Sequence, residues 1–205
     1  MIADDIQIYL PKFLSSDSEN ELFSGLKDFP DNIDSRLYTN HLSETEIVYQ
    51  GDGIKDMLVV NLPDTKIDKA PTIVLSNTCD IFESNSRMFD SQIVYAPIIN
   101  LAKYEHAISK SSKSREQIKS HIEAIRKQRI TQIFYLPQNG SMIDESIVFL
   151  DRVNNSPSTS IARNQICERR LFSLSDYGAY LFILKLSIHF TRIQDKVERK
   201  SIKIG

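Results

Sequence analysis

The sequence predicts an α+β domain in which a small, strongly curved β-barrel carries an inserted helical hairpin and a long C-terminal helix. Two short, unbroken runs of β-branched and apolar residues, Thr72–Leu75 and Ile93–Ile98, indicate the barrel, because such runs are typical of strands buried on both faces. Helical spacing over Asn100–Gln132 and an apolar helical pattern from Asp176 indicate the helices. With 205 residues, the chain fits a single domain.

The first 44 residues precede the barrel as an extension. Residues 4–14 alternate weakly between polar and apolar side chains, which predicts a short strand or an extended arm. Ser16 or Ser18 is expected to cap a helix that ends at Lys27, and Phe29–Asn32 has the chemistry of a turn. We expect the extension either to cover the barrel or to form an interface.

The barrel is expected to occupy residues 45–100 and 132–172. Its first strands are predicted within Thr45–Gln50 and over Met57–Leu62. Its second part contributes strands over Gln132–Leu136, Ser146–Val153 and Arg169–Phe172. The expected connections are turns at Gly51–Gly53 and Asn154–Ser158, a polar loop at Thr65–Lys69, and a loop rich in functional groups at Ser76–Ser91.

The insertion at residues 101–131 is predicted to be a helical hairpin divided by Ser109–Ser114. Residues 101–130 hold eight Lys or Arg and three Glu, whereas the whole chain has a net charge of −2. A basic patch on an acidic body is therefore expected, with a solvated helical face as the alternative. The candidate nucleic-acid contacts are the cations Lys69, Lys113, Arg115, Lys119, Arg126, Lys127 and Arg129.

The final helix is expected to be capped by Ser173 or Ser175 and to run over residues 173–200. Its apolar residues form two stripes, so the helix needs two partners. One partner is the barrel, and the other is the inserted hairpin or a second subunit.

Neither composition nor spacing points to a membrane, a disulfide or a metal. Cys79 and Cys167 are far apart in the sequence, and we expect both to be free thiols. The start of the chain has no basic and apolar leader pattern, and no apolar run reaches 18 residues, so we expect a cytoplasmic protein. The four histidines lack metal-ligand spacing, and neither a metal nor a cofactor is expected.

Four stretches occur in the order known from one family. Pro71–Asn77 followed by Ile93–Ile98 resembles the signature of the MazF/PemK-like growth-inhibitor toxins, in which an Arg-Pro strand precedes a strand that ends in Ala-Pro-Ile-Thr. Gly51-Asp52 is similar to the family's early Gly-Asp, and Glu145–Val153 to its later apolar strand. The resemblance covers roughly residues 45–100 and 132–193.

This resemblance implies an SH3-like barrel, usually a dimer, and metal-independent cleavage of single-stranded RNA. It also implies a bacterial toxin–antitoxin or phage-defence setting, with an antitoxin or another protein encoded nearby as partner. The family has an Arg before the strand-opening proline and a Thr or Ser after the second strand. These positions are Ala70 and Ile99 here, and neither side chain can supply the charge or the hydroxyl.

Replacement catalytic residues are therefore sought in the 76–91 loop, with Asp80 and Thr78 as acid or base and Arg87 as the cation. Lys69, the residue before Ala70, is the other candidate cation. The alternatives are an Asx turn or capping role for Asp80, and a buried structural role for Cys79. We expect a binding protein whose usual ribonuclease residues are replaced. The alternatives are an active endoribonuclease that uses this loop, or an unrelated hydrolytic site at residues 78–80.

Overall fold

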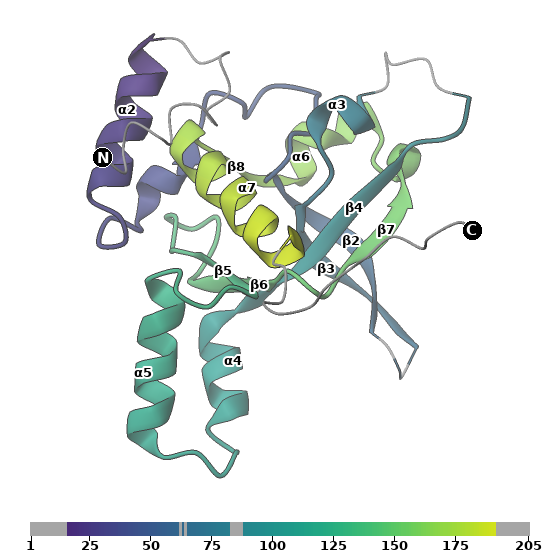
Figure 1. The fold of residues 1–205 in the computed structure, drawn as a ribbon. Coiled ribbons are helices and arrows are strands. Elements are labelled where there is room, and N and C mark those ends of the chain that lie inside the picture. The colour runs from purple at the N-terminus through teal and green to yellow at the C-terminus, as the bar shows by residue number, and fades with distance from the viewer. Residues whose placement is uncertain (1–15, 62, 64, 83–87, 192–205) are drawn as a thin grey trace, which may run out of the picture.

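A computed structural model describes residues 16–61, 63, 65–82 and 88–191, and it confirms the α+β class (Figure 1). The strands pair antiparallel in the order β1-β8-β2-β3-β4-β6-β5, with β7 also beside β4. Within the described part of the chain, this path does not close into a barrel. The strands are β1 (Tyr38–Thr39), β2 (Gly53–Asn61), β3 (Lys66–Val74), β4 (Gln92–Asn100), β5 (Ile133–Leu136), β6 (Ser146–Phe149), β7 (Asn154–Pro157) and β8 (Arg170–Leu174).

The helices surround this sheet. Figure 1 shows α7 lying across the sheet, with α2 beside it and the α4–α5 pair projecting away. The α-helices are α2 (Ser16–Lys27), α3 (Thr78–Ile81), α4 (Leu101–Ile108), α5 (Arg115–Arg126), α6 (Ile166–Arg169) and α7 (Asp176–Thr191). Short 3₁₀ turns occur at η2 (Ser35–Leu37), η3 (Ser158–Ser160) and η4 (Arg163–Gln165).

The end of β3 (Thr72–Val74) and most of β4 are buried between apolar clusters on both faces, as the sequence predicts. Ile73 and Ala96 face one apolar cluster, which α7 and α2 cover. Val74 and Tyr95 face a second cluster, which α3 and α6 help to cover. Each cluster removes a set of large side chains from water, which is the main favourable contribution to folding.

The predicted helical hairpin is confirmed. Ser114 and Gln117 form a reciprocal capping box at the start of α5, which satisfies two otherwise unpaired N–H groups. Ile122 and Ile125 of α5 pack against β5 and β6 in a third apolar cluster. The hairpin is therefore anchored on the sheet at its base.

The start of α7 is also as predicted, because the Ser175 hydroxyl accepts a hydrogen bond from the Gly178 N–H at 3.1 Å. Further along, the buried Lys185 ammonium donates to the carbonyls of Gln128 and Ile130, at 2.9 and 2.7 Å. The hairpin is thus one of the two partners that the helix needs. Its expected continuation to Lys200 lies outside the described residues.

The N-terminal extension covers the sheet. Leu22 of α2 is buried in the cluster under α7, and a Cβ added at Gly25 would lie 2.8 Å from the Tyr177 ring. The Tyr177 hydroxyl donates to the Asn32 side chain at 2.7 Å. Residues 4–14, for which a strand or an arm is expected, lie outside the described part.

Two predicted connections are wrong. Residues 65–69 do not form a loop, because Lys66–Val74 is one strand whose first half pairs with β2 in a two-stranded arm. This arm extends beyond the apolar core, so its polar residues and also its apolar Leu58, Val60 and Ile67 are exposed. Asn154–Ser158 is not a turn either, because Asn154–Pro157 pairs with β4, and this pairing outweighs the local turn preference.

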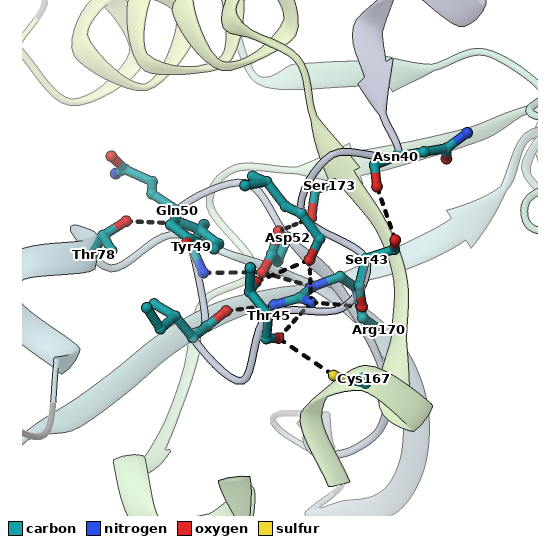
Figure 2. A network of polar contacts seen from close by, with 12 residues as sticks. Asn40, Ser43, Thr45, Tyr49, Gln50, Asp52, Thr78, Cys167, Arg170 and Ser173 are labelled. Atoms are coloured by element: carbon teal, nitrogen blue, oxygen red, sulfur yellow. Dashed lines mark hydrogen bonds and ion pairs between the residues drawn. The ribbon is translucent and has the colours of Figure 1, made fainter. Parts of the chain in front are cut away.

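The strand predicted within Thr45–Gln50 is absent, because the Arg170 side chain forms hydrogen bonds with backbone carbonyls of this segment. The Arg170 guanidinium donates to the carbonyls of Leu42 and Thr45, at 2.6 and 2.8 Å, and to that of Ile47 (Figure 2). Carbonyls that bond to a side chain are not available for a sheet ladder.

Arg170 also pairs with Asp52, and the two side chains are only 3% and 1% exposed. Asp52 accepts from Arg170 Nε at 3.2 Å, from the Ser173 hydroxyl at 2.6 Å and from the Tyr49 N–H at 2.9 Å. Burial raises the pKa of Asp52, and these three contacts act in the opposite direction. We call Arg170, Asp52 and Ser173 the buried node; it joins β8 to the segment before β2.

We predict that Arg170→Met strongly destabilises the protein, by about 3–5 kcal/mol, because it leaves a buried carboxylate and several carbonyls without their donor. Urea unfolding measures this loss. The matched control is Arg36→Met, because Arg36 forms an exposed ion pair with Asp34 and exposed ion pairs contribute little to stability. Equal effects of the two substitutions would contradict the assignment.

We predict that Lys185 makes stability rise with pH. Burial lowers the pKa of Lys185 to about 8 in the folded protein, whereas the unfolded chain has the ordinary value of 10.5. Between these values the unfolded state binds more protons, so the free energy of unfolding increases with pH, by on the order of 2–3 kcal/mol in total. The measurement is the difference between wild type and Lys185→Met from pH 7.5 to 10.5. A difference that does not change with pH would refute the prediction.

Candidate functional site

The register of β3 and β4 brings together the two positions at which the resembled family has its catalytic pair. The pairing of β3 with β4 ends at Thr72 opposite Pro97, and Ala70 and Ile99, two residues further along each strand, line the same hollow. Both residues lie on the face of the sheet that carries Val74 and Tyr95 further along. On this face, Val74 and Tyr95 belong to the apolar core, whereas Ala70 and Ile99 line an open groove.

The groove has a volume of about 620 Å³, and we call it the arm groove. One wall is the β2–β3 arm, the floor is the end of β4, and the other wall is the segment between β6 and β7. Its lining residues are Val59, Val60, Asn61, Lys66, Asp68, Ala70, Pro97, Ile98, Ile99, Asp151, Arg152, Val153 and Asn154.

The arm groove has equal numbers of positively and negatively charged side chains. Lys66 forms an exposed ion pair with Asp68 at 3.4 Å, and Asp151 and Arg152 contribute one charge of each sign. The Arg152 guanidinium lies over the Phe149 ring, 4.1 Å from its centroid, and this contact orients it. The groove is therefore polar and neutral overall.

Two hydrogen bonds hold the arm in position beside the groove. The Val60 N–H donates to Asn154 Oδ1 at 2.8 Å, and the Tyr95 hydroxyl donates to the Leu58 carbonyl at 2.6 Å. Both contacts link β2 to strands that are not its ladder neighbours at this point. The groove therefore has a defined shape without a ligand.

The lining of the arm groove contains no hydroxyl, thiol or imidazole side chain. The groups able to accept or donate a proton there are the carboxyls of Asp68 and Asp151 and the ammonium of Lys66. Among the described residues, the lining therefore offers no serine, threonine or cysteine as a nucleophile.

Thr78 and Asp80 belong to α3 and do not line the arm groove. The Thr78 hydroxyl accepts a hydrogen bond from the Gln50 N–H at 3.0 Å. Asn77 rather than Asp80 caps α3, because its side chain accepts from the Cys79 N–H. Arg87, the third residue predicted in this loop, lies outside the described residues.

Neither cysteine forms a disulfide, as predicted, and both are exposed. The expectation of a buried structural role for Cys79 is therefore wrong. Its position in the first turn of a short surface helix leaves the side chain outside the apolar clusters.

The cations predicted to bind nucleic acid divide into three groups. Lys69 is exposed and follows the alternation of β3 to the side opposite Ala70, where it lines a separate hollow with Lys55 and Arg169. Two cations pair with carboxylates: Arg126 with Glu145 and Lys127 with Asp31. The exposed cations that remain on the hairpin are Lys113, Arg115, Lys119 and Arg129.

The ion pair between Arg126 and Glu145 is part of a polar contact between the hairpin and the sheet. Arg126 binds Glu145 through two hydrogen bonds, of 2.9 and 2.8 Å, and the Tyr135 hydroxyl donates to the same carboxylate at 2.5 Å. The hydrogen bond from Arg126 holds the pKa of Glu145 below its usual range. This cluster locks the hairpin onto β5 and the start of β6.

Sequence reasoning missed Lys66, Asp151, Arg152 and Asn154 as groove residues. The available signal was the alternation of Lys66, Asp68 and Ala70, which would have put these three on one face had residues 65–69 been assigned to a strand. The wall formed by Asp151 and Arg152 has no comparable signal, because the end of β6 at Phe149 depends on tertiary pairing.

No protein-family model and no curated protein matches this chain. No helix in the described ranges has the length and apolarity needed to cross a membrane. Among these same residues, no three His, Cys, Asp or Glu side chains gather closely enough to bind a metal ion.

Proposed function

We propose that this protein is a toxin-like barrel protein of a bacterial toxin–antitoxin or phage-defence system, and that it binds single-stranded RNA in the arm groove. The observation that carries the proposal is the meeting of Ala70 and Ile99 in one open, pre-shaped groove. In this proposal the groove corresponds to the family's site, and Ala70 and Ile99 stand where the family has its catalytic side chains. A cytoplasmic location is part of the proposal.

The curvature of the sheet supports an SH3-like barrel. The Val60–Asn154 and Tyr95–Leu58 hydrogen bonds cross from β7 and β4 to β2, where no ladder closes the sheet. The cluster that includes Ile54, Val74 and Ile93 lies on the concave side of these strands. Side-chain contacts thus take the place of the missing ladder.

Binding is favoured over cleavage because the two positions of the family's catalytic pair supply neither a cation nor a hydroxyl here. Metal-independent cleavage needs a base for the 2′-hydroxyl, an acid for the leaving oxygen and a cation for the developing charge. Lys66 is paired with Asp68, and neither Ala70 nor Ile99 can contribute. Active cleavage is the second candidate, and the adjacent Asp151 and Arg152 favour it more than Thr78, Asp80 or Arg87 in the 76–91 loop.

A protein partner is a further candidate, and an observation on the arm favours it. Leu58, Val60 and Ile67 are 55%, 42% and 60% exposed, and the pairing of β2 with β3 puts them on the same face. Exposed apolar groups on one face are typical of a protein contact, such as that of an antitoxin encoded nearby. Leu58 and Ile67 lie on the face opposite Ala70, whereas Val60 also borders the arm groove, so RNA and a protein partner would meet at Val60.

We also propose a homodimer in which two copies of the chain meet through α7. Ile183, Leu184 and Phe190 on this helix are between 42% and 61% exposed, although they are large and apolar. A helix that is apolar on more than one side needs a second cover, which another copy of the chain supplies.

We predict that the protein binds a labelled single-stranded oligoribonucleotide of about five nucleotides, and that Arg152→Glu weakens this binding about tenfold. The substitution reverses the charge of the groove's exposed guanidinium. Fluorescence anisotropy at several salt concentrations measures the affinity. Lys27→Glu, the same charge change on α2, is the control. Wild-type affinity in Arg152→Glu would argue against binding in the groove.

We predict no cleavage when the protein is incubated with a long single-stranded RNA in EDTA, with product formation followed on denaturing gels. Cleavage that Asp151→Asn abolishes would support the second candidate and contradict simple binding. Cleavage that persists in Asp151→Asn but disappears in Asp80→Ala or Arg87→Ala would instead assign the chemistry to the 76–91 loop.

A further inference from the structure

The arm groove is neutral, so it offers little net attraction to a polyanion. A strand of RNA bound there requires additional cations along its path. One basic surface is the α4–α5 hairpin, because residues 101–130 carry five more positive than negative charges. One RNA strand can bind to both the arm groove and the hairpin only if a continuous surface connects them.

A row of four side chains in contact with one another links the arm groove to the hairpin. Arg152 of the groove lies 4.1 Å from the centroid of Phe149, and the Phe149 ring meets Tyr104 of α4 edge to face at 5.6 Å. The Tyr104 ring in turn lies 6.0 Å from His121 of α5. The row therefore starts in the groove, crosses the base of the hairpin and ends between its two helices.

The row ends in a hollow of about 410 Å³, which we call the hairpin hollow. Tyr104 and His121 line it and are joined by a hydrogen bond of 2.9 Å between the hydroxyl and Nε2. Both rings are partly exposed, and Ile118 and Lys113 border them. An aromatic surface with a cation at its rim is a suitable site for an unstacked nucleobase and its phosphate.

The charges around the hairpin hollow fit this ligand. Arg126 and Lys127 at the base of the hairpin are neutralised by Glu145 and Asp31. The exposed cations Lys113, Arg115 and Lys119 belong to the outer part of the hairpin, where Lys113 borders the hollow. The hairpin is thus most basic where the row of rings ends.

We propose that the hairpin hollow is a second nucleotide-binding subsite, and that a single RNA strand runs from the arm groove past Arg152 and Phe149 into it. This inference rests on the proposed function. The bases stack on His121 and Tyr104, and Lys113 contacts a phosphate. A single strand is required, because the bases of a duplex are stacked on each other and cannot enter the hollow.

The test compares oligoribonucleotides of two lengths on the full chain. An oligouridylate of about 5 nucleotides fills one subsite, and one of about 15 reaches both. We expect the longer RNA to bind at least tenfold more tightly at equal salt. His121→Ala and Lys113→Glu are expected to weaken binding of the longer RNA about tenfold and to leave that of the shorter one unchanged. Lys113→Glu changes an exposed loop residue, so it tests the subsite even if His121→Ala perturbs the helix pair.

Lys27→Glu again controls for net charge and is expected to change neither affinity. Equal affinity of the two lengths, or insensitivity of the longer RNA to both hairpin variants, would overturn the second subsite while leaving the groove intact. Absence of binding at both lengths would instead overturn the groove proposal and the subsite with it.

Discussion

The burial of the Arg170 guanidinium is the interaction on which the rest of the structure depends. A buried cation requires a counter-ion and a full set of acceptors, and Asp52 together with the carbonyls of residues 42–47 supplies them. These contacts turn an irregular segment into a fixed wall beside the sheet. The backbone of Asp52 also accepts from the Val74 N–H, so the same residue aligns β3. The start of β2, the end of β3 and β8 are thereby held together, and the direction of the β2–β3 arm follows from this.

The candidate site arises where the apolar core ends. Along β4, Ile93 and Tyr95 are buried, whereas Pro97 and Ile99 on the same face line the arm groove. The alternation that builds the core therefore continues into an open surface.

The helical insertion is fixed to the sheet by contacts of three kinds. Ile122 and Ile125 pack on β5 and β6, Arg126 and Tyr135 share the Glu145 carboxylate, and Lys185 bonds the carbonyls that follow α5. A hairpin held in this way carries its exposed cations at a constant position relative to the arm groove. The insertion is thus suited to extend a binding surface rather than to act as a loose tether.

The sequence by itself determined the α+β class, both buried strands, the helical hairpin and the start of the last helix, because hydrophobic periodicity and capping residues are local signals. Only the tertiary structure decided β7, the first half of β3 and the absence of a strand at residues 45–50. In each case a distant partner, β4, β2 or Arg170, outweighs local preference. The site divides in the same way. The replacement of two catalytic side chains at Ala70 and Ile99 is visible in the resemblance, whereas the wall with Asp151 and Arg152 depends on where β6 stops. Local patterns report which residues are buried, and packing between distant segments decides which polar residues meet.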